Sequence, residues 1–142
     1  MQDSSSSVMS LDVGGSRIGV ALANVVARIA SPLTTLDALQ TTWVDIARLV
    51  EQHRVVALCV GLPRGLDGQE TDQTRTVRAF ADELQKKIYV HVYLQDEAVT
   101  SRQAEAELQA RGKPYVKGDI DALAATYILE DFLRDHPEAL EL

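Results

Sequence analysis

Cysteine is almost absent from this chain. The single one, Cys59, lies in the apolar run from Val55 to Val60, so an internal disulfide and a cysteine-rich zinc site are both excluded. A free cysteine in such a run usually packs as a small apolar residue, and we expect Cys59 to be buried.

Long hydrophobic runs are also missing. No segment approaches the ~18 uninterrupted apolar residues that identify a membrane-spanning helix, although 46% of the residues are hydrophobic. The first seven residues, Met1 to Ser7, contain neither the basic start nor the apolar segment of a signal peptide. We therefore expect a cytoplasmic protein with no membrane partner.

Basic residues are scarce. Fourteen Lys and Arg stand against twenty-one Asp and Glu, which gives a net charge of -7. This is the wrong sign for a protein that holds nucleic acid by bulk electrostatics. A nuclease, however, needs only a local basic rim, and its catalytic carboxylates add negative charge that a bound metal neutralises. The charge therefore does not exclude such an enzyme.

The length of 142 residues fits one compact domain. We predict a disordered serine-rich segment at residues 1–7, one domain at residues 8–135 and an acidic tail at residues 136–142. Turn residues divide the start of the domain into three short strands at residues 8–13, 17–23 and 27–30. Gly14 and Gly15 suit a tight hairpin after the first strand, and Pro32 is expected to end the third.

Helical periodicity then alternates with apolar runs. Apolar residues at i, i+3, i+4 and i+7 predict helices over residues 42–53 and 72–87. Each helix is followed by a predicted strand, over residues 55–60 and 88–95, which is typical of parallel βαβ crossovers. The sequence thus predicts an α/β fold with a mixed five-stranded sheet, three antiparallel strands and then parallel crossovers, flanked by helices.

Two further helices are expected near the end of the chain. Thr100 and Gln103 have capping-box spacing and should begin a third helix, which Gly112 and Pro114 terminate. Asp119 is a plausible N-cap for a last helix over residues 120–134.

Acidic residues stand at the ends of three of these elements. Asp121 shares a helical stripe with apolar residues, and Asp12 lies near the end of an apolar strand, on the face of Val8 and Ser10. Asp96 and Glu97 follow the strand at residues 88–95, where alternation sends their side chains to opposite faces, so at most one can join Asp12. Each acid also has an ordinary structural interpretation, as a turn residue, a helix-start residue or a solvated side chain.

Together these acids predict a site where an α/β sheet normally places one. Three converging carboxylates without a His or Cys partner suit hard cations such as Mg²⁺ or Mn²⁺. Two such ions about 4 Å apart can activate a water and stabilise the leaving oxygen of a phosphodiester. The three histidines, His53, His91 and His136, are too dispersed to form a metal set and are interpreted as structural.

Four collinear motifs between about Val8 and Leu133 resemble those of the YqgF (RuvX) family, which belongs to the ribonuclease-H-like superfamily and is linked to pre-16S rRNA maturation. They are an aspartate strand with a glycine turn and Arg-Ile-Gly-Val-Ala (11–21), Val-Gly-Leu-Pro with Asp-Gly (60–68), Asp-Glu with Thr-Ser (96–101), and the start of the last helix (117–125).

The resemblance implies a ribonuclease-H-like fold, metal ligands at Asp12, Asp121 and Glu97 or Asp96, and hydrolysis of RNA during ribosome biogenesis. The chain departs from the family at two positions. Ala98 stands where an arginine is usual, and Asp119 stands where a basic residue is frequent. A phosphate-contacting charge could thus be missing.

Basic residues flank the acidic motifs, and we expect RNA contacts from them: Arg17, Arg64, Lys113 and Lys117. The segment from Arg111 to Gly118 is rich in glycine and proline and separates the last two helices. We predict that it closes over the substrate.

Three alternatives remain open. The segment from Asp12 to Ser16 also resembles the first phosphate loop of actin-like and sugar-kinase proteins, but those enzymes clamp ATP between two related domains. The substrate could instead be a four-way DNA junction, which normally requires a symmetric dimer, and the sequence leaves monomer and homodimer open. A non-catalytic nucleic-acid-binding module is the third.

Overall fold

The structure, a computed structural model, describes residues 4–41, 43–65, 67–97 and 101–140. Its strands are β1 (Ser7–Val13), β2 (Arg17–Asn24), β3 (Ala30–Asp37), β4 (Val55–Leu62) and β5 (His91–Asp96). Its helices are α1 (Trp43–Gln52), α2 (Asp72–Lys87), α3 (Ser101–Arg111), α4 (Lys117–Asp135) and the short 3-10 helix η1 (Pro137–Leu140). Among the described residues, no helix is both long and apolar enough to cross a membrane.

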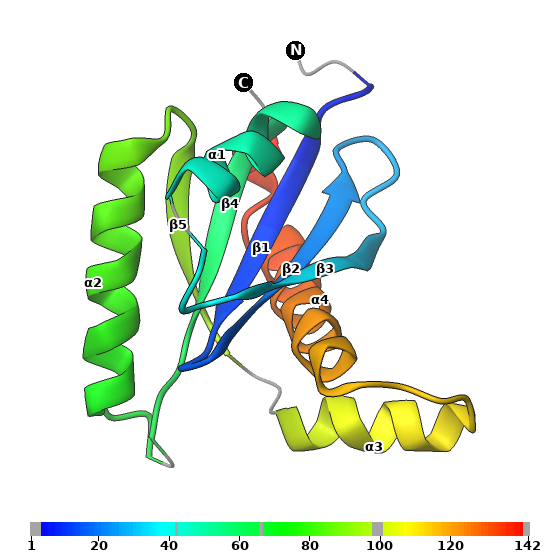
Figure 1. Cartoon of the computed structure of the whole chain (residues 1–142). Helices are drawn as coiled ribbons and strands as arrows, with labels where there is room; N and C mark the ends of the chain where they lie inside the picture. The colour runs from blue at the N-terminus through cyan, green and yellow to red at the C-terminus, as the bar shows by residue number, and fades with distance from the viewer. Residues whose placement is uncertain (1–3, 42, 66, 98–100, 141–142) are drawn as a thin grey trace.

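The five strands form one mixed sheet in the order β3-β2-β1-β4-β5 (Figure 1). The first three strands pair antiparallel, and β4 lies parallel to both β1 and β5. Helix α2 supplies the crossover between the parallel neighbours β4 and β5, and α1 connects β3 to β4. The predicted fold class is therefore confirmed.

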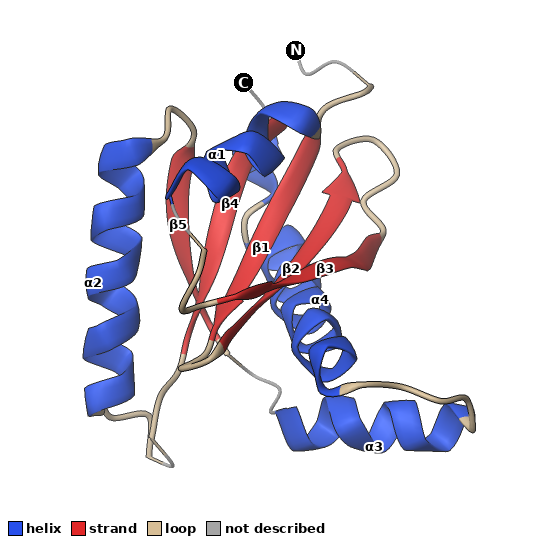
Figure 2. Cartoon of the chain, viewed as in Figure 1, coloured by secondary structure: helices blue, strands red, loops and turns tan. Residues whose placement is uncertain are grey.

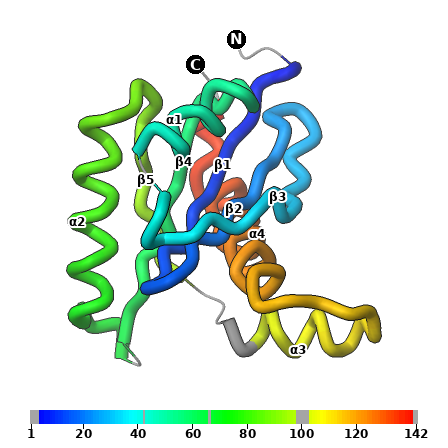
Figure 3. Tube along the Cα trace, in the orientation of Figure 1, coloured from blue at the N-terminus to red at the C-terminus, as the bar shows by residue number. Residues whose placement is uncertain are grey.

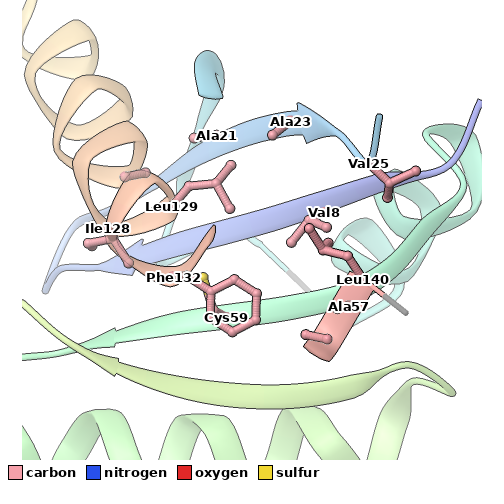
Figure 4. Packing of buried hydrophobic residues seen from close by; sticks show 12 residues of the cluster. Val8, Ala21, Ala23, Val25, Ala57, Cys59, Ile128, Leu129, Phe132 and Leu140 are labelled. Atoms are coloured by element: carbon pink, nitrogen blue, oxygen red, sulfur yellow. The ribbon is translucent and has the colours of Figure 1, made fainter. Parts of the chain in front are cut away.

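Helices cover both faces of the sheet (Figure 2). Helices α1 and α2 pack on one face, where Ile46, Val77 and Leu84 join Met9 and Leu11 in one apolar cluster. Helix α4 and η1 pack on the other face, as Figure 4 shows for the side chains around Val8, Cys59 and Phe132. Cys59 is fully buried there, as expected.

Strand β1 alternates between these two faces. Met9 and Leu11 face α1 and α2, whereas Val8 faces α4 and the Ser10 hydroxyl donates a 2.6 Å hydrogen bond to the carbonyl of Ala125. Because side chains in a strand alternate, Asp12 also belongs to the α4 face. The sequence-based prediction that Val8, Ser10 and Asp12 share a face is consistent with this arrangement.

The sequence-based prediction placed the third strand too early, at residues 27–30 instead of Ala30–Asp37. Residues 25–27 form a turn, because the Asn24 side chain accepts hydrogen bonds from the backbone N–H groups of Val26 and Ala27. Strand β3 then begins at Ala30 and continues through Pro32. Proline is tolerated here because β3 is an edge strand, and its register against β2 shifts between Val20 and Ala21, beside the Pro32 pair.

Several helix boundaries follow their capping residues. Helix α2 spans the predicted 72–87, with the Thr71 hydroxyl accepting from the backbone N–H of Thr74. Helix α3 ends before Gly112, which adopts a φ of 71° that favours glycine. The predicted cap at Thr100 lies outside the described residues.

Asp119 is not the N-cap of the last helix. Helix α4 begins at Lys117, three residues before the predicted start. Asp119 occupies the third helical position, and its carboxylate accepts a hydrogen bond from the backbone N–H of Val116. An acidic side chain at this position satisfies one of the free N–H groups at a helix start, so the helix extends back by almost one turn.

The ends of the domain extend further than the sequence indicated. Ser6 and Ser7, predicted to be disordered, are buried, and β1 begins at Ser7, whose N–H donates to the carbonyl of Arg54. In the predicted tail, Ala139 and Leu140 of η1 are buried and belong to the apolar cluster on the α4 face of the sheet, in which Figure 4 labels Leu140. Residues 1–3 and 141–142 lie outside the described part of the chain.

Candidate active site

The candidate acidic residues lie where several element ends meet. Strands β1, β4 and β5 are parallel, so their carboxyl ends share one edge of the fold, and the antiparallel β2 begins there. Helix α4 also begins beside this edge, in the lower part of the view in Figure 3. Asp12 comes from the end of β1, Glu97 follows β5, and Asp121 lies in the first turns of α4.

Asp12 and Glu97 are hydrogen-bonded to each other through their side chains. The Glu97 backbone N–H donates to the carbonyl of Leu62, which extends the pairing of β5 with β4 and fixes where Glu97 leaves the sheet. Its side chain lies over Gly61, where an added Cβ would be 2.9 Å from the Glu97 carboxylate and 2.4 Å from the Ile128 side chain. Gly61 therefore leaves the space that Glu97 occupies.

Burial and mutual repulsion raise the pKa values of this pair. Burial is the main cause that raises the pKa of Glu97 to about 8, and the charge of Asp12 and their hydrogen bond raise it further. Burial also raises the pKa of Asp12, against the opposing effect of the hydrogen bond from Glu97, and the negative charge of Asp121 adds to the rise. At pH 7 Glu97 thus holds a proton that it shares with Asp12.

Asp121 is held by Arg17, whose Nε donates a hydrogen bond to Asp121 Oδ2. The Asp121 side chain is 17% exposed and the Arg17 side chain 41% exposed. The stripe that Asp121 shares is apolar as predicted, since Ala125, Ile128 and Phe132 are buried. Asp121 is therefore a mostly buried acid that is paired with Arg17 and lies close enough to Asp12 to affect its pKa.

Glycine sets the position of Asp121. A Cβ added at Gly19 of β2 would lie 2.0 Å from the backbone oxygen of Asp121, so only glycine lets the start of α4 approach the sheet this closely. Two hydroxyl groups then fasten the helix: Ser10 bonds the carbonyl of Ala125, and Thr35 bonds the carbonyl of Gly118 at 2.5 Å. Gly19, Ser10 and Thr35 were not singled out from the sequence as site-forming residues, although a glycine inside a strand pattern is the signal for a close backbone approach.

Asp96 lies apart from this group. It is exposed and forms an ion pair with Arg64, with 3.2 Å between Arg64 Nε and Asp96 Oδ1. It lines a hollow with residues of α2 and the end of α4. The alternation expected for adjacent strand residues therefore brings Glu97 to Asp12 and sends Asp96 elsewhere.

The chemistry of the donor set fits a hard cation, but its present arrangement is incomplete. Three carboxylates from three elements offer oxygen ligands only, which Mg²⁺ and Mn²⁺ prefer. In the part of the chain that the structure describes, however, no three His, Cys, Asp or Glu side chains are arranged to hold a metal ion. Asp12 and Glu97 are together, while Asp121 is engaged by Arg17.

The predicted basic residues divide into separate surfaces. Arg17 and Lys117 line one hollow together with Asp121. Lys113 lines another hollow with Tyr115, between α3 and α4, and Arg64 lies with Asp96. The structure thus brings only two of the four predicted RNA-contacting residues next to the acidic group. Ala98, the other departure from the family pattern, lies outside the described residues.

Two solved resolvase structures have a similar fold. The solved structure of T. thermophilus RuvC in complex with Holliday junction substrate superposes with a TM-score of 0.52 at 18% identity, covering 91% of this chain and 95% of that one. The fowlpox virus Holliday junction resolvase gives a TM-score of 0.54 at 12% identity, covering 96% and 99%. These likenesses show that the fold is ribonuclease-H-like.

Sequence relatives are closer. A protein of Shewanella oneidensis named "Putative pre-16S rRNA nuclease" is 35% identical over 133 residues, which cover 91% of this chain and 94% of the relative. A protein of the same name from Chloroflexus aurantiacus is 42% identical over 130 residues, which cover 89% and 85%. The sequence profile of the RuvX family, described as Holliday junction resolvase, matches residues 6–135. The chain therefore belongs to the RuvX family.

Proposed function

We propose that this protein is a metal-dependent endonuclease that hydrolyses RNA phosphodiester bonds, in the 5'-end maturation of pre-16S rRNA. The observation that carries the proposal is the meeting of Asp12 and Glu97, with Asp121 beside them, at one edge of a ribonuclease-H-like sheet. The names of the relatives from Shewanella oneidensis and Chloroflexus aurantiacus support pre-16S rRNA as the substrate.

In this proposal Asp12, Glu97 and Asp121 hold the cation. Bound Mg²⁺ or Mn²⁺ would supply the activation of a water and the stabilisation of the leaving oxygen. Glu97 would hold the cation as a carboxylate and would therefore give up the proton that it shares with Asp12, because a carboxyl group binds a hard cation in its ionised form. Arg17 and Lys117 contact phosphates, since both line the hollow beside Asp121. Asp96 does not hold the cation, because it is exposed and forms an ion pair with Arg64, apart from the acidic group.

Branched DNA is the second candidate substrate. The family description and the RuvC complex with a Holliday junction favour it. Cutting a four-way junction symmetrically requires two sites related by a two-fold axis. This alternative therefore predicts a homodimer in solution, whereas RNA cleavage needs only a monomer.

The deciding experiment compares substrates and metals. The purified protein is incubated with a structured RNA that contains the 16S precursor 5' region, and separately with a four-way DNA junction, in Mn²⁺, Mg²⁺ or EDTA. We expect RNA cleavage with either metal, none in EDTA, and none by the Asp12→Asn variant. Cleavage of the junction alone, by a protein that sediments as a dimer, would favour the resolvase. Cleavage of neither substrate would leave a non-catalytic binding module.

A further inference from the structure

Arg17 is a basic residue that lies against the acidic group of Asp12, Glu97 and Asp121. It is the first residue of β2, immediately after the hairpin in which the Gly14 N–H donates to the Arg17 carbonyl at 2.8 Å. This hairpin fixes its backbone beside the end of β1, where Val13 pairs with Ile18. From there its guanidinium reaches Asp121 on α4, a contact between residues far apart in the sequence.

We propose that Arg17 is a built-in counter-ion, which holds the Asp121 carboxylate in the metal-free protein, releases it when a divalent cation binds, and then contacts a phosphate of the nucleic acid. This inference rests on the proposed nuclease function. It adds a role in metal binding to a residue that has otherwise been expected only to contact RNA.

Arg17 and a bound cation would compete for the same oxygen of Asp121. Asp121 Oδ2 accepts the hydrogen bond from Arg17, so a cation that binds this carboxylate must displace the guanidinium or share it. A divalent ion and a guanidinium also repel each other at such close range. This accounts for the finding that the described acidic residues include no complete metal-binding group, although Asp12 and Glu97 are already joined.

The positive charge of Arg17 also balances the negative charges of Asp12 and Asp121. Asp12 and Asp121 interact electrostatically, and burial disfavours charge at Asp12. The Arg17 cation offsets the repulsion in a partly desolvated site, which otherwise opposes folding. A metal would take over the same task with twice the charge, and Arg17 would then be available to another anion.

The position of Arg17 indicates what that anion is. Arg17 lines an open hollow together with Lys117, and its side chain is 41% exposed, so the guanidinium can turn outward without moving the backbone. Guanidinium groups match phosphate oxygens geometrically and form paired hydrogen bonds with them. A phosphate of the nucleic-acid backbone is therefore the anion that fits beside the acidic group.

The test measures Mn²⁺ affinity in the absence of nucleic acid. Calorimetric titrations with MnCl₂ compare the parent with Arg17→Gln, Arg17→Lys and Arg48→Gln. Arg48 is the matched control, since it is exposed on α1, forms a 3.7 Å ion pair with Asp45, and loses the same charge. We expect Arg17→Gln to bind Mn²⁺ about tenfold more tightly, as for loss of a competing interaction of ~1.4 kcal/mol. The Mn²⁺ affinity of Arg17→Lys should lie between those of the parent and Arg17→Gln, and the affinity of Arg48→Gln should match the parent's.

A second readout must move the other way. In cleavage assays with saturating Mn²⁺, Arg17→Gln should raise the KM for RNA several-fold, because the released guanidinium no longer meets a phosphate. A merely structural role for Arg17 would weaken Mn²⁺ binding and RNA binding together. Thermal melts in EDTA show whether each variant folds. If Arg17→Gln does not fold, the Mn²⁺ affinity of Arg17→Lys is used instead. A Mn²⁺ affinity equal to or weaker than the parent's overturns the proposal.

Two failures are distinguishable. If the parent binds Mn²⁺ but Arg17→Gln binds it no more tightly than Arg48→Gln, the counter-ion role is wrong and the nuclease proposal stands. If the parent binds no Mn²⁺, or Asp12→Asn cleaves RNA like the parent, the nuclease proposal fails and takes this inference with it.

Discussion

Changing Glu97 to glutamine should remove a large pH dependence from the stability of the metal-free protein. Burial against Asp12 raises the pKa of Glu97 from 4.5 to about 8 in the folded state. In the unfolded chain the same carboxyl group ionises near its ordinary value. The folded protein therefore binds a proton that the unfolded protein releases between these two pH values.

The direction follows from this difference. The raised folded-state pKa contributes stability that is fully present below pH 4.5 and is lost as the pH rises to about 8. Each unit of pKa shift corresponds to ~1.4 kcal/mol, so the loss over the whole window is on the order of several kcal/mol. Above pH 8 the loss from this group levels off, because Glu97 is then ionised in both states.

Glutamine stays neutral and retains an N–H donor for Asp12. Urea unfolding in EDTA between pH 5 and pH 9 should show the parent losing several kcal/mol that Glu97→Gln does not lose. Glu51→Gln, which alters an exposed residue of α1, serves as the control and should follow the parent. Parallel loss of stability in the parent and Glu97→Gln would refute the shared proton and with it the buried contact between Glu97 and Asp12.

Three other changes test separate parts of the structure. Asp12→Asn should abolish metal-dependent cleavage. In EDTA its stability should match the parent's or exceed it by up to ~1 kcal/mol, and in excess Mn²⁺ it should be less stable than the parent, because metal stabilises only the state that binds it. If the variant melts well below the parent in EDTA, Asp12 is a structural turn residue instead. Gly19→Ala places a Cβ 2.0 Å from the Asp121 carbonyl and should cost at least ~2 kcal/mol together with activity, whereas Gly15→Ala, with nothing within 4 Å, should be nearly neutral in thermal melts. Lys117→Gln should weaken RNA binding and reduce the slope of log affinity against log salt by about 1, and an unchanged slope would place the basic rim elsewhere. Hydrogen exchange at residues 111–118 should slow when RNA binds, if this segment closes over the substrate; equal exchange with and without RNA would count against closure.

Local patterns in the sequence were sufficient for most of the architecture. The apolar stripe of α2 predicts a helix without reference to the rest of the fold, and alternation in β1 places Asp12 on the face of Ser10. The third strand was misplaced because its position depends on the Asn24 turn and on β3 being an edge strand. Neither property is visible in a local hydrophobic pattern.

The acidic group was only partly predictable for a similar reason. Alternation allowed one of Asp96 and Glu97 at the site, but the choice depends on which face of the sheet α4 covers. The pairing of Arg17 with Asp121 joins β2 to α4 across most of the chain, and no spacing rule connects them. Gly19 and Gly61 matter because other elements approach them, which only the assembled fold reveals.

A comparison of two adjacent acids tests the central claim most directly. Glu97 lies against Asp12, whereas Asp96 is exposed and paired with Arg64, although only one peptide bond separates them. Cleavage of structured pre-16S RNA in Mn²⁺ should fall by at least the roughly 10- to 100-fold that is typical for loss of a group supporting a metal ligand in Glu97→Gln, and should stay within a few-fold of the parent in Asp96→Asn. Equal loss in both variants, or cleavage that survives Glu97→Gln, would contradict the assignment of Asp12, Glu97 and Asp121 as one site.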